Sequence, residues 1–210
     1  MPANKVKFGL SNVHVVETIL ADDGSASFGE TILKVPGAVD LVMDPANDAE
    51  PFRADDIDYW NNGGTPGFSG TLEMALFPAA FKIMCLSFKR DGKGVLYEPS
   101  PKPDKHFAIM FQFKNDANRT RHIIHNVTFG RLSLASHTTE RPETPITESI
   151  PMNSSPIYVP ALDEWIDQAE MDEATDSTVY NNFFTTPYIP APAESENPET
   201  PATTATTGNP

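Results

Sequence analysis

The chain has 210 residues, a single cysteine and a formal net charge of −14. The charge is uneven, because residues 1–141 hold all 15 Lys and Arg against 17 acids, whereas residues 142–210 hold 12 acids and no Lys or Arg. This distribution argues against nucleic-acid binding by phosphate neutralisation, which needs clustered basic residues. One cysteine gives no disulfide framework, and the length fits one domain with extensions.

The first ten residues, MPANKVKFGL, lack the apolar region of a signal peptide, and no apolar run approaches the length of a membrane span. We therefore expect a protein that is made and kept in a cytoplasm and has no membrane partner.

The N-terminal quarter alternates between apolar and polar residues in the manner of strands. The predicted elements are, in order, strands at 5–10 and 13–19, a turn at 22–25 and a long strand at 31–43. Pro36 and Gly37 lie in the middle of the long strand and predict a bulge, a bend or an edge position there.

Residues 52–78 predict one long β-hairpin that leads into a helix. Its second strand has an apolar face made by Phe68, Gly70, Leu72, Met74 and Leu76, and a polar face made by Ser69, Thr71, Glu73 and Ala75. The first strand is unusually acidic, with Asp55, Asp56 and Asp58. The connector is too long for a two-residue turn and predicts a projecting loop of Asn61, Asn62, Gly63, Gly64, Thr65, Pro66 and Gly67.

One core helix is predicted over about residues 78–90, with Pro78 as its first residue. Its apolar stripe is Phe77, Phe81, Met84, Cys85 and Phe88. A short strand at 95–98 and a second hairpin of strands at 106–113 and 120–129 follow. In the latter strand, alternation places Arg121, Ile123, His125, Val127 and Phe129 on one face. Weaker strands are expected at 133–136 and 145–150.

The C-terminal part changes character. Residues 157–159 predict a last strand, residues 161–174 an acidic helix with a narrow apolar stripe, and residues 178–184 a short helix capped by Asp176 or Ser177. We thus expect a β-domain at 1–156, a helical segment at 157–188 that packs on the domain or a neighbour, and a Pro/Thr/Glu-rich tail at 189–210. The fold class is mainly β, an antiparallel sandwich or partial barrel with one core helix.

Residues with catalytic or ligand-binding chemistry are few. His122 and His125 are three apart and point to opposite faces of a strand, so structural roles are expected rather than a metal site. Cys85 lies on the apolar helix stripe and is expected to be a core residue. Asp56 and Asp58 share a strand face and admit a cation, but a solvated acidic face is the preferred interpretation. No phosphate loop or nucleophile motif is found, so we expect no enzyme, no cofactor and no metal.

Several stretches together resemble the major tail proteins of long-tailed, siphovirus-type phages of Gram-positive bacteria. They are Asn4–Leu10 with Asn12–His14, Val35–Val39 with Asp44–Pro45, Phe52–Ile57, Gly67–Leu76, Lys105–Ala108, Arg121–His122 with Asn126–Thr128, and Thr178–Phe184. The similarity covers most of residues 4–188, and the departures are the acidic stretch around 161–174 and the tail from Pro190.

The resemblance implies a structural virion protein whose hexameric rings stack into a tail tube. DNA passes through this tube without specific binding at ejection. The implied fold is a β-sandwich whose inner sheets join around the ring into a barrel. The implied partners are further copies of the chain, the tape measure protein, and tail terminator or distal tail proteins. The implied location is the virion tail.

Two hypotheses connect the residues to this role. Lumen-facing positions are expected to include Asp56, Asp58, Ser69, Thr71 and Glu73, whose carboxylates would repel phosphates. The loop at 61–67 is expected to contact the next ring. The alternative function is a β-sandwich module that binds carbohydrate or a receptor at a virion tip, for which Trp60 near the loop is a candidate.

Overall fold

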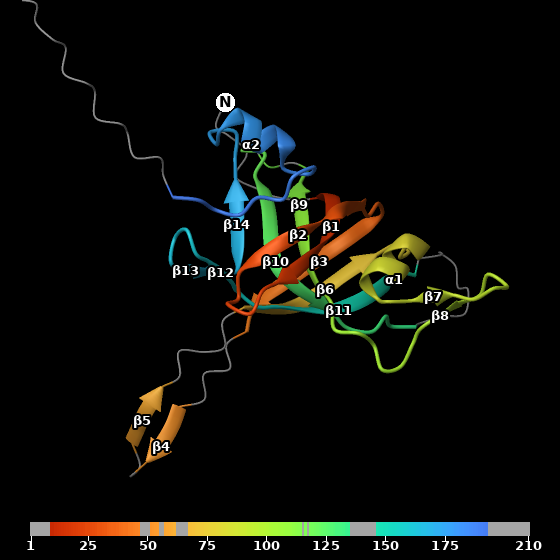
Figure 1. The fold of residues 1–210 in the computed structure, drawn as a ribbon, viewed down its shortest axis with the longest axis horizontal. Coiled ribbons are helices and arrows are strands. Elements are labelled where there is room, and N and C mark those ends of the chain that lie inside the picture. The colour runs from red at the N-terminus through yellow and green to blue at the C-terminus, as the bar shows by residue number, and fades with distance from the viewer. Residues whose placement is uncertain are drawn as a thin grey trace, which may run out of the picture.

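The computed structural model describes residues 9–46, 51–54, 57–61, 67–114, 116, 118–134 and 146–192. They form a mainly β structure, as the sequence predicts, and the described part also contains two short helices (Figure 1). The strands are β1 (Leu10–Leu20), β2 (Ala26–Lys34), β3 (Ala38–Pro45), β4 (Pro51–Ala54), β5 (Ile57–Asn61), β6 (Phe68–Met74), β7 (Lys89–Arg90), β8 (Leu96–Tyr97), β9 (His106–Phe113), β10 (Arg121–Phe129), β11 (Glu148–Ser154), β12 (Ile157–Val159), β13 (Glu164–Ile166) and β14 (Gln168–Met171). The helices are α1 (Ala79–Cys85) and α2 (Ser177–Asn182).

The main sheet is antiparallel and has the order β2-β1-β9-β10-β11-β6-β3, with β14 also paired to β10. The consecutive strands β2 and β3 therefore lie at opposite ends of this order. Two hydrogen bonds hold the corner between β2 and β3. The Val35 amide donates to the Val13 carbonyl of β1 (2.8 Å), and the Gly37 carbonyl accepts from the amide of Ala75, just after β6 (2.8 Å). The corner thus bridges β1 and the end of β6.

The single strand expected at 31–43 is wrong, but the bend predicted at Pro36 and Gly37 is confirmed. Gly37 adopts a φ of +94°, in the left-handed region that favours glycine, and Pro36 precedes it. The chain breaks there into β2, which pairs with β1, and β3, which pairs with β6.

The long hairpin predicted over residues 52–78 is also wrong. β5 pairs with β4 in a separate two-stranded sheet, whereas β6 pairs with β3 on one edge and β11 on the other. Both edges of β6 are therefore occupied by strands that are distant in sequence. The two ends of the segment that connects β3 to β6 are joined, because the Ala46 amide donates to the Gly67 carbonyl at 3.0 Å.

The main core lies between α1 and one face of the strands β1, β6, β9, β10 and β11. The predicted stripe is confirmed, because Phe77, Phe81 and Cys85 are buried in this core. The ring of Phe81 lies 4.9 Å from that of Phe77 and 5.2 Å from that of Phe129. The helix ends at Cys85, not near residue 90, because Ser87 takes a φ of +60° and the next residues form β7.

A second apolar cluster covers the other face of β1, β9 and β10. Its buried members are Val16, Ala108, Met110, Ile123, Met171 and Phe183. The single face predicted for residues 121–129 is wrong, because a register shift between Ile124 and Val127 moves the odd positions from this cluster to the main core. At the same bulge, β10 changes its second partner from β14 to β11.

The helix predicted over residues 161–174 is wrong as well. This stretch forms β13, which pairs with β12, and β14, which pairs with β10. The short helix α2 is confirmed, and Asp176 is its cap: the carboxylate accepts hydrogen bonds from the amides of Thr178 (2.9 Å) and Val179 (3.1 Å).

Candidate functional site

The outward face of β3, β6 and β11 is polar and acidic. Cross-strand pairing places its side chains in three rows: Asp40, Glu73 and Ser149; Val42, Thr71 and Pro151; Asp44, Ser69 and Asn153. All nine are exposed or half-buried, and none is Lys or Arg. We call these nine residues the acidic wall.

The wall forms because apolar and polar side chains alternate along β3, β6 and β11, and strand pairing aligns the polar positions. On the opposite face, Leu72, Met74 and Ile150 are fully buried in the main core, and Leu41 and Met43 pack against it. Each strand therefore has one apolar and one wet side, and the pairing registers align the wet sides. Three carboxylates on one small surface without an intervening cation give that surface a negative potential.

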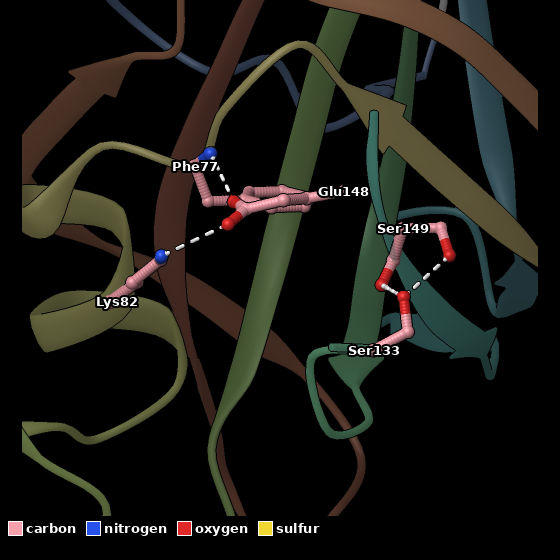
Figure 2. Close-up of polar contacts among 5 residues, drawn as sticks. All are labelled: Phe77, Lys82, Ser133, Glu148 and Ser149. Carbon is pink, nitrogen blue, oxygen red and sulfur yellow. Dashed lines mark hydrogen bonds and ion pairs between the residues drawn. The ribbon is translucent and has the colours of Figure 1, made fainter. Parts of the chain in front are cut away.

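Glu73 is held in place within the wall, because its carboxylate accepts a hydrogen bond from the Thr147 hydroxyl. At the same end of β11, the hydroxyl of Ser133 donates to the Ser149 carbonyl at 3.0 Å and lies 2.9 Å from the Ser149 hydroxyl. Figure 2 shows this contact, which fixes the loop after β10 against the edge of the wall.

Glu148 faces away from the wall and ties β11 to α1. One carboxylate oxygen accepts a hydrogen bond from the Phe77 amide at 2.7 Å, and the other lies 3.5 Å from the Lys82 ammonium (Figure 2). Its neighbour Ser149 belongs to the wall. The same strand thus contributes to the wet face and, one residue earlier, to the anchoring of the helix.

The predicted lumen-facing residues are described in part. Ser69, Thr71 and Glu73 lie together on one face of β6, as the alternation predicts. Asp56 lies outside the described residues, and Asp58 belongs to β5, whose side chains also lie outside the described part. Of the predicted loop, residues 62–66 lie outside it, Asn61 ends β5, and Gly67 precedes β6.

Sequence reasoning did not assign Asp40 and Asp44 to the site. Asp40 lies in the strand predicted at 31–43 and Asp44 directly follows it, but no local pattern shows that this strand pairs with β6. The hairpin expected at 52–78 assigned that edge of β6 to another strand.

Cys85, His122 and His125 are packed against other side chains and have structural roles. Burial raises the pKa of the Cys85 thiol well above its ordinary value, so the thiolate needed for nucleophilic chemistry is disfavoured. His122 stacks on Phe111 and His125 on Phe28, which pack in different clusters, so the two rings lie on opposite faces as predicted. Within the described residues, no group of three or more His, Cys, Asp or Glu is placed to hold a metal ion.

A shallow pocket of about 230 Å³ lies between α2 and residues 186–189. Its volume is below the roughly 300–1,000 Å³ usual for small-molecule sites. None of the helices in the described part is long and apolar enough to cross a membrane.

No protein-family model matches the chain, and no curated protein matches it either.

Proposed function

We propose that this chain is the tail tube protein of a long-tailed phage, a structural protein whose rings stack into a non-contractile conduit for DNA. The observation that carries the proposal is the acidic wall, a sheet face with three carboxylates and no cation. The sequence resemblance points to the same function.

A DNA conduit needs a lining that does not retain phosphates. Duplex DNA carries one negative charge per roughly 1.7 Å of helix axis, so a cationic lining would bind it along its whole length. Asp40, Asp44 and Glu73 would repel it instead, while Ser69, Thr71 and Asn153 keep the surface wet. The wall then serves by failing to bind DNA.

The proposed tube needs sheets that continue from one copy to the next. β3 ends the main sheet, and its second edge pairs with no described strand. Such an edge is able to accept a strand of another chain. We propose an antiparallel sandwich or partial barrel of the tail tube type, in which ring closure covers this edge with a neighbouring copy.

The segment that connects β3 to β6 begins and ends beside the wall row that contains Asp44 and Ser69. We expect a segment that starts at the end of a channel wall to reach along the channel. This supports our proposal that the predicted loop at 61–67 contacts the next ring.

The number of copies in a ring, the partners and the location are proposed from the sequence resemblance. Six copies form each ring, and the tape measure protein and the tail terminator or distal tail proteins are the partners at other positions. The protein is assembled in the bacterial cytoplasm and resides in the virion tail.

Negative-stain electron microscopy of the purified chain over a concentration series tests the proposal. Rings or short hollow tubes are the expected result. A particle that stays monomeric or trimeric at every concentration would contradict it.

One observation favours the alternative, a carbohydrate- or receptor-binding module. Trp165 is 61% exposed and its ring lies 5.4 Å from that of Tyr158. Exposed aromatic pairs are a common feature of sugar-binding surfaces. Monomeric or trimeric particles that bind a glycan array, and lose that binding on Trp165→Ala, would support this alternative.

A further inference from the structure

The β12–β13 hairpin presents an aromatic pair to solvent. Tyr158 and Trp165 are cross-strand partners, and their rings are tilted against each other at a centroid distance of 5.4 Å. Trp165 is 61% exposed although it is one of only two tryptophans in the chain. Tryptophan and tyrosine are among the residue types enriched at the hot spots of protein interfaces.

The pair is rigid, with Trp165 exposed and Tyr158 half-buried. A Cβ at Gly24 would lie 2.5 Å from Cη2 of Trp165, so the indole packs directly on the glycine backbone of the β1–β2 turn. The Tyr158 amide donates to the Gly24 carbonyl at 2.9 Å, and the Tyr158 hydroxyl donates to the Asp163 carboxylate at 2.5 Å. A side chain that is already fixed loses little conformational entropy when a partner binds.

The surroundings of the pair are acidic. The exposed carboxylates next to it come from the β1–β2 turn and from the β12–β13 connection: Asp22, Asp23 and Asp163. Residues 146–192 contain eight acids and no Lys or Arg. We call Tyr158, Trp165 and these three acids the aromatic platform. A fixed indole face beside carboxylates favours an ammonium or guanidinium group.

A surface of complementary charge lies on the opposite side of the same molecule. The β7–β8 ribbon projects beyond α1, on the side away from β12 and β13 (Figure 1). It presents the exposed basic residues Lys89, Arg90 and Lys93. It also presents two apolar side chains, Val95 and Tyr97, that are exposed. We call residues 89–97 the basic ribbon.

The basic ribbon has its own acid bound within its turn. The carboxylate of Asp91 accepts hydrogen bonds from the amides of Lys93 (2.9 Å) and Val95 (2.8 Å), and Arg90 donates to the Gly94 carbonyl at 2.8 Å. These bonds make the turn rigid and leave Lys89 and Lys93 on an exposed surface. The ribbon is therefore preorganised in the same way as the platform.

We propose that the aromatic platform of one copy binds the basic ribbon of a second copy. Because the two surfaces lie on opposite sides of the molecule, the contact is heterologous and repeats from copy to copy, as a ring or a polymer requires. A lysine or arginine of the ribbon lies over Trp165 between the platform carboxylates, and Val95 and Tyr97 supply the apolar contact. The inference rests on the proposed function, since it names a second pair of surfaces, besides the free edge of β3, through which the tube copies meet.

The test compares assembly of the full chain and its variants by sedimentation and negative-stain microscopy. Lys89→Glu with Lys93→Glu reverses the ribbon, and Asp22→Lys with Asp23→Lys reverses the platform. Each pair is expected to raise the concentration needed for assembly about tenfold or more, since tenfold corresponds to loss of about 1.4 kcal/mol at each contact. The four changes in one chain restore complementarity and are expected to recover most of the loss. Trp165→Ala is expected to weaken assembly without charge reversal.

The matched control is Lys34→Glu with Lys114→Glu, which makes the same charge change at exposed residues outside the ribbon. Thermal unfolding of every variant separates misfolding from loss of contact. If the reversed variants assemble like the wild type, the inference is overturned while tubes still support the proposed function. If the wild type itself never assembles, the proposed function is overturned, and the inference is overturned as well because it needs a second copy as the partner. The inference would also be overturned if the wild type binds a glycan, Trp165→Ala abolishes that binding, and the Trp165→Ala variant still assembles like the wild type.

Discussion

The backbone of Gly70 on β6 lies against the carbonyl of Val42 on β3, and a Cβ at Gly70 would overlap the Val42 carbonyl oxygen. The two strands therefore approach each other at this point more closely than any residue with a side chain allows. Val42 and Gly70's neighbour Thr71 belong to the middle row of the acidic wall. The close spacing of β3 and β6 under the wall depends on this contact.

Gly70→Ala is expected to destabilise the chain by about 1–3 kcal/mol, because the added methyl group forces β3 away from β6. Chemical denaturation monitored by circular dichroism measures the change. Gly92→Ala is the control, since a Cβ there has no neighbour within 4 Å and the backbone φ is not positive. Equal stability of the two variants would show that the strands separate without cost.

Glu148 is expected to stabilise the chain chiefly through its hydrogen bond from the Phe77 amide. Glu148→Ala removes that acceptor and should cost about 1–2 kcal/mol. Glu148→Gln keeps an acceptor oxygen and should cost less. Lys82→Met removes only the partly exposed ion pair at 3.5 Å and should cost below about 1 kcal/mol. Unfolding of the three variants under one condition decides the order, and a Lys82 effect as large as that of Glu148→Ala would contradict it.

Stability is expected to decrease as the pH falls below about 6.5. Burial lowers the pKa of His125, although hydrogen bonds to the Tyr188 and Asp167 carbonyls partly oppose this. The unfolded chain then takes up a proton below the ordinary value of 6.5 while the folded chain does not. The stability contributed by the neutral ring is full above that pH and is lost as the pH falls through the folded pKa, at up to about 1.4 kcal/mol per unit.

His125→Gln has no titrating ring and keeps a donor for the Tyr188 carbonyl. Its stability between pH 7.5 and 5.5 is expected to change less than that of the wild type, measured by urea unfolding at each pH. The pKa of His14 is also lowered, mainly by burial, so part of the dependence is expected to remain. Parallel curves for the two proteins would show that His125 does not contribute.

The acidic wall is expected to keep DNA from binding. Asp40→Lys with Asp44→Lys reverses two exposed wall carboxylates, and tubes of this variant should retain short duplex DNA at low salt and release it as salt rises. Glu30→Lys with Glu170→Lys makes the same charge change outside the wall and should bind less. Fluorescence anisotropy with labelled duplex measures retention. Equal binding by both variants would show that the wall is not the surface that DNA meets.

The sequence predicted the local features better than the pairing of strands. The alternation of Ser69, Thr71 and Glu73 identified the polar face of β6, and the apolar stripe identified α1, because both signals lie within one element. The partners of β6 are β3 and β11, and no local pattern states which distant strand occupies an edge. Asp40 and Asp44 were therefore not recognised as neighbours of Glu73.

The error at residues 161–174 has a similar origin. Leu162, Trp165, Ile166 and Ala169 have helical spacing, but β14 pairs with β10 and places Ala169 opposite Ile123. Pairing with a buried strand overrides the weak intrinsic preference of the segment. Trp165, which a helix would place in the apolar stripe, is exposed on β13 instead.

The most direct test of the proposed function is a cryo-electron microscopy map of the assembled protein at side-chain resolution. We predict a hollow tube of stacked rings in which the acidic wall, with Asp40, Thr71 and Glu73, faces the channel. A tube whose channel is lined by another face would contradict the role of the wall, and the absence of any tube would contradict the proposed function itself.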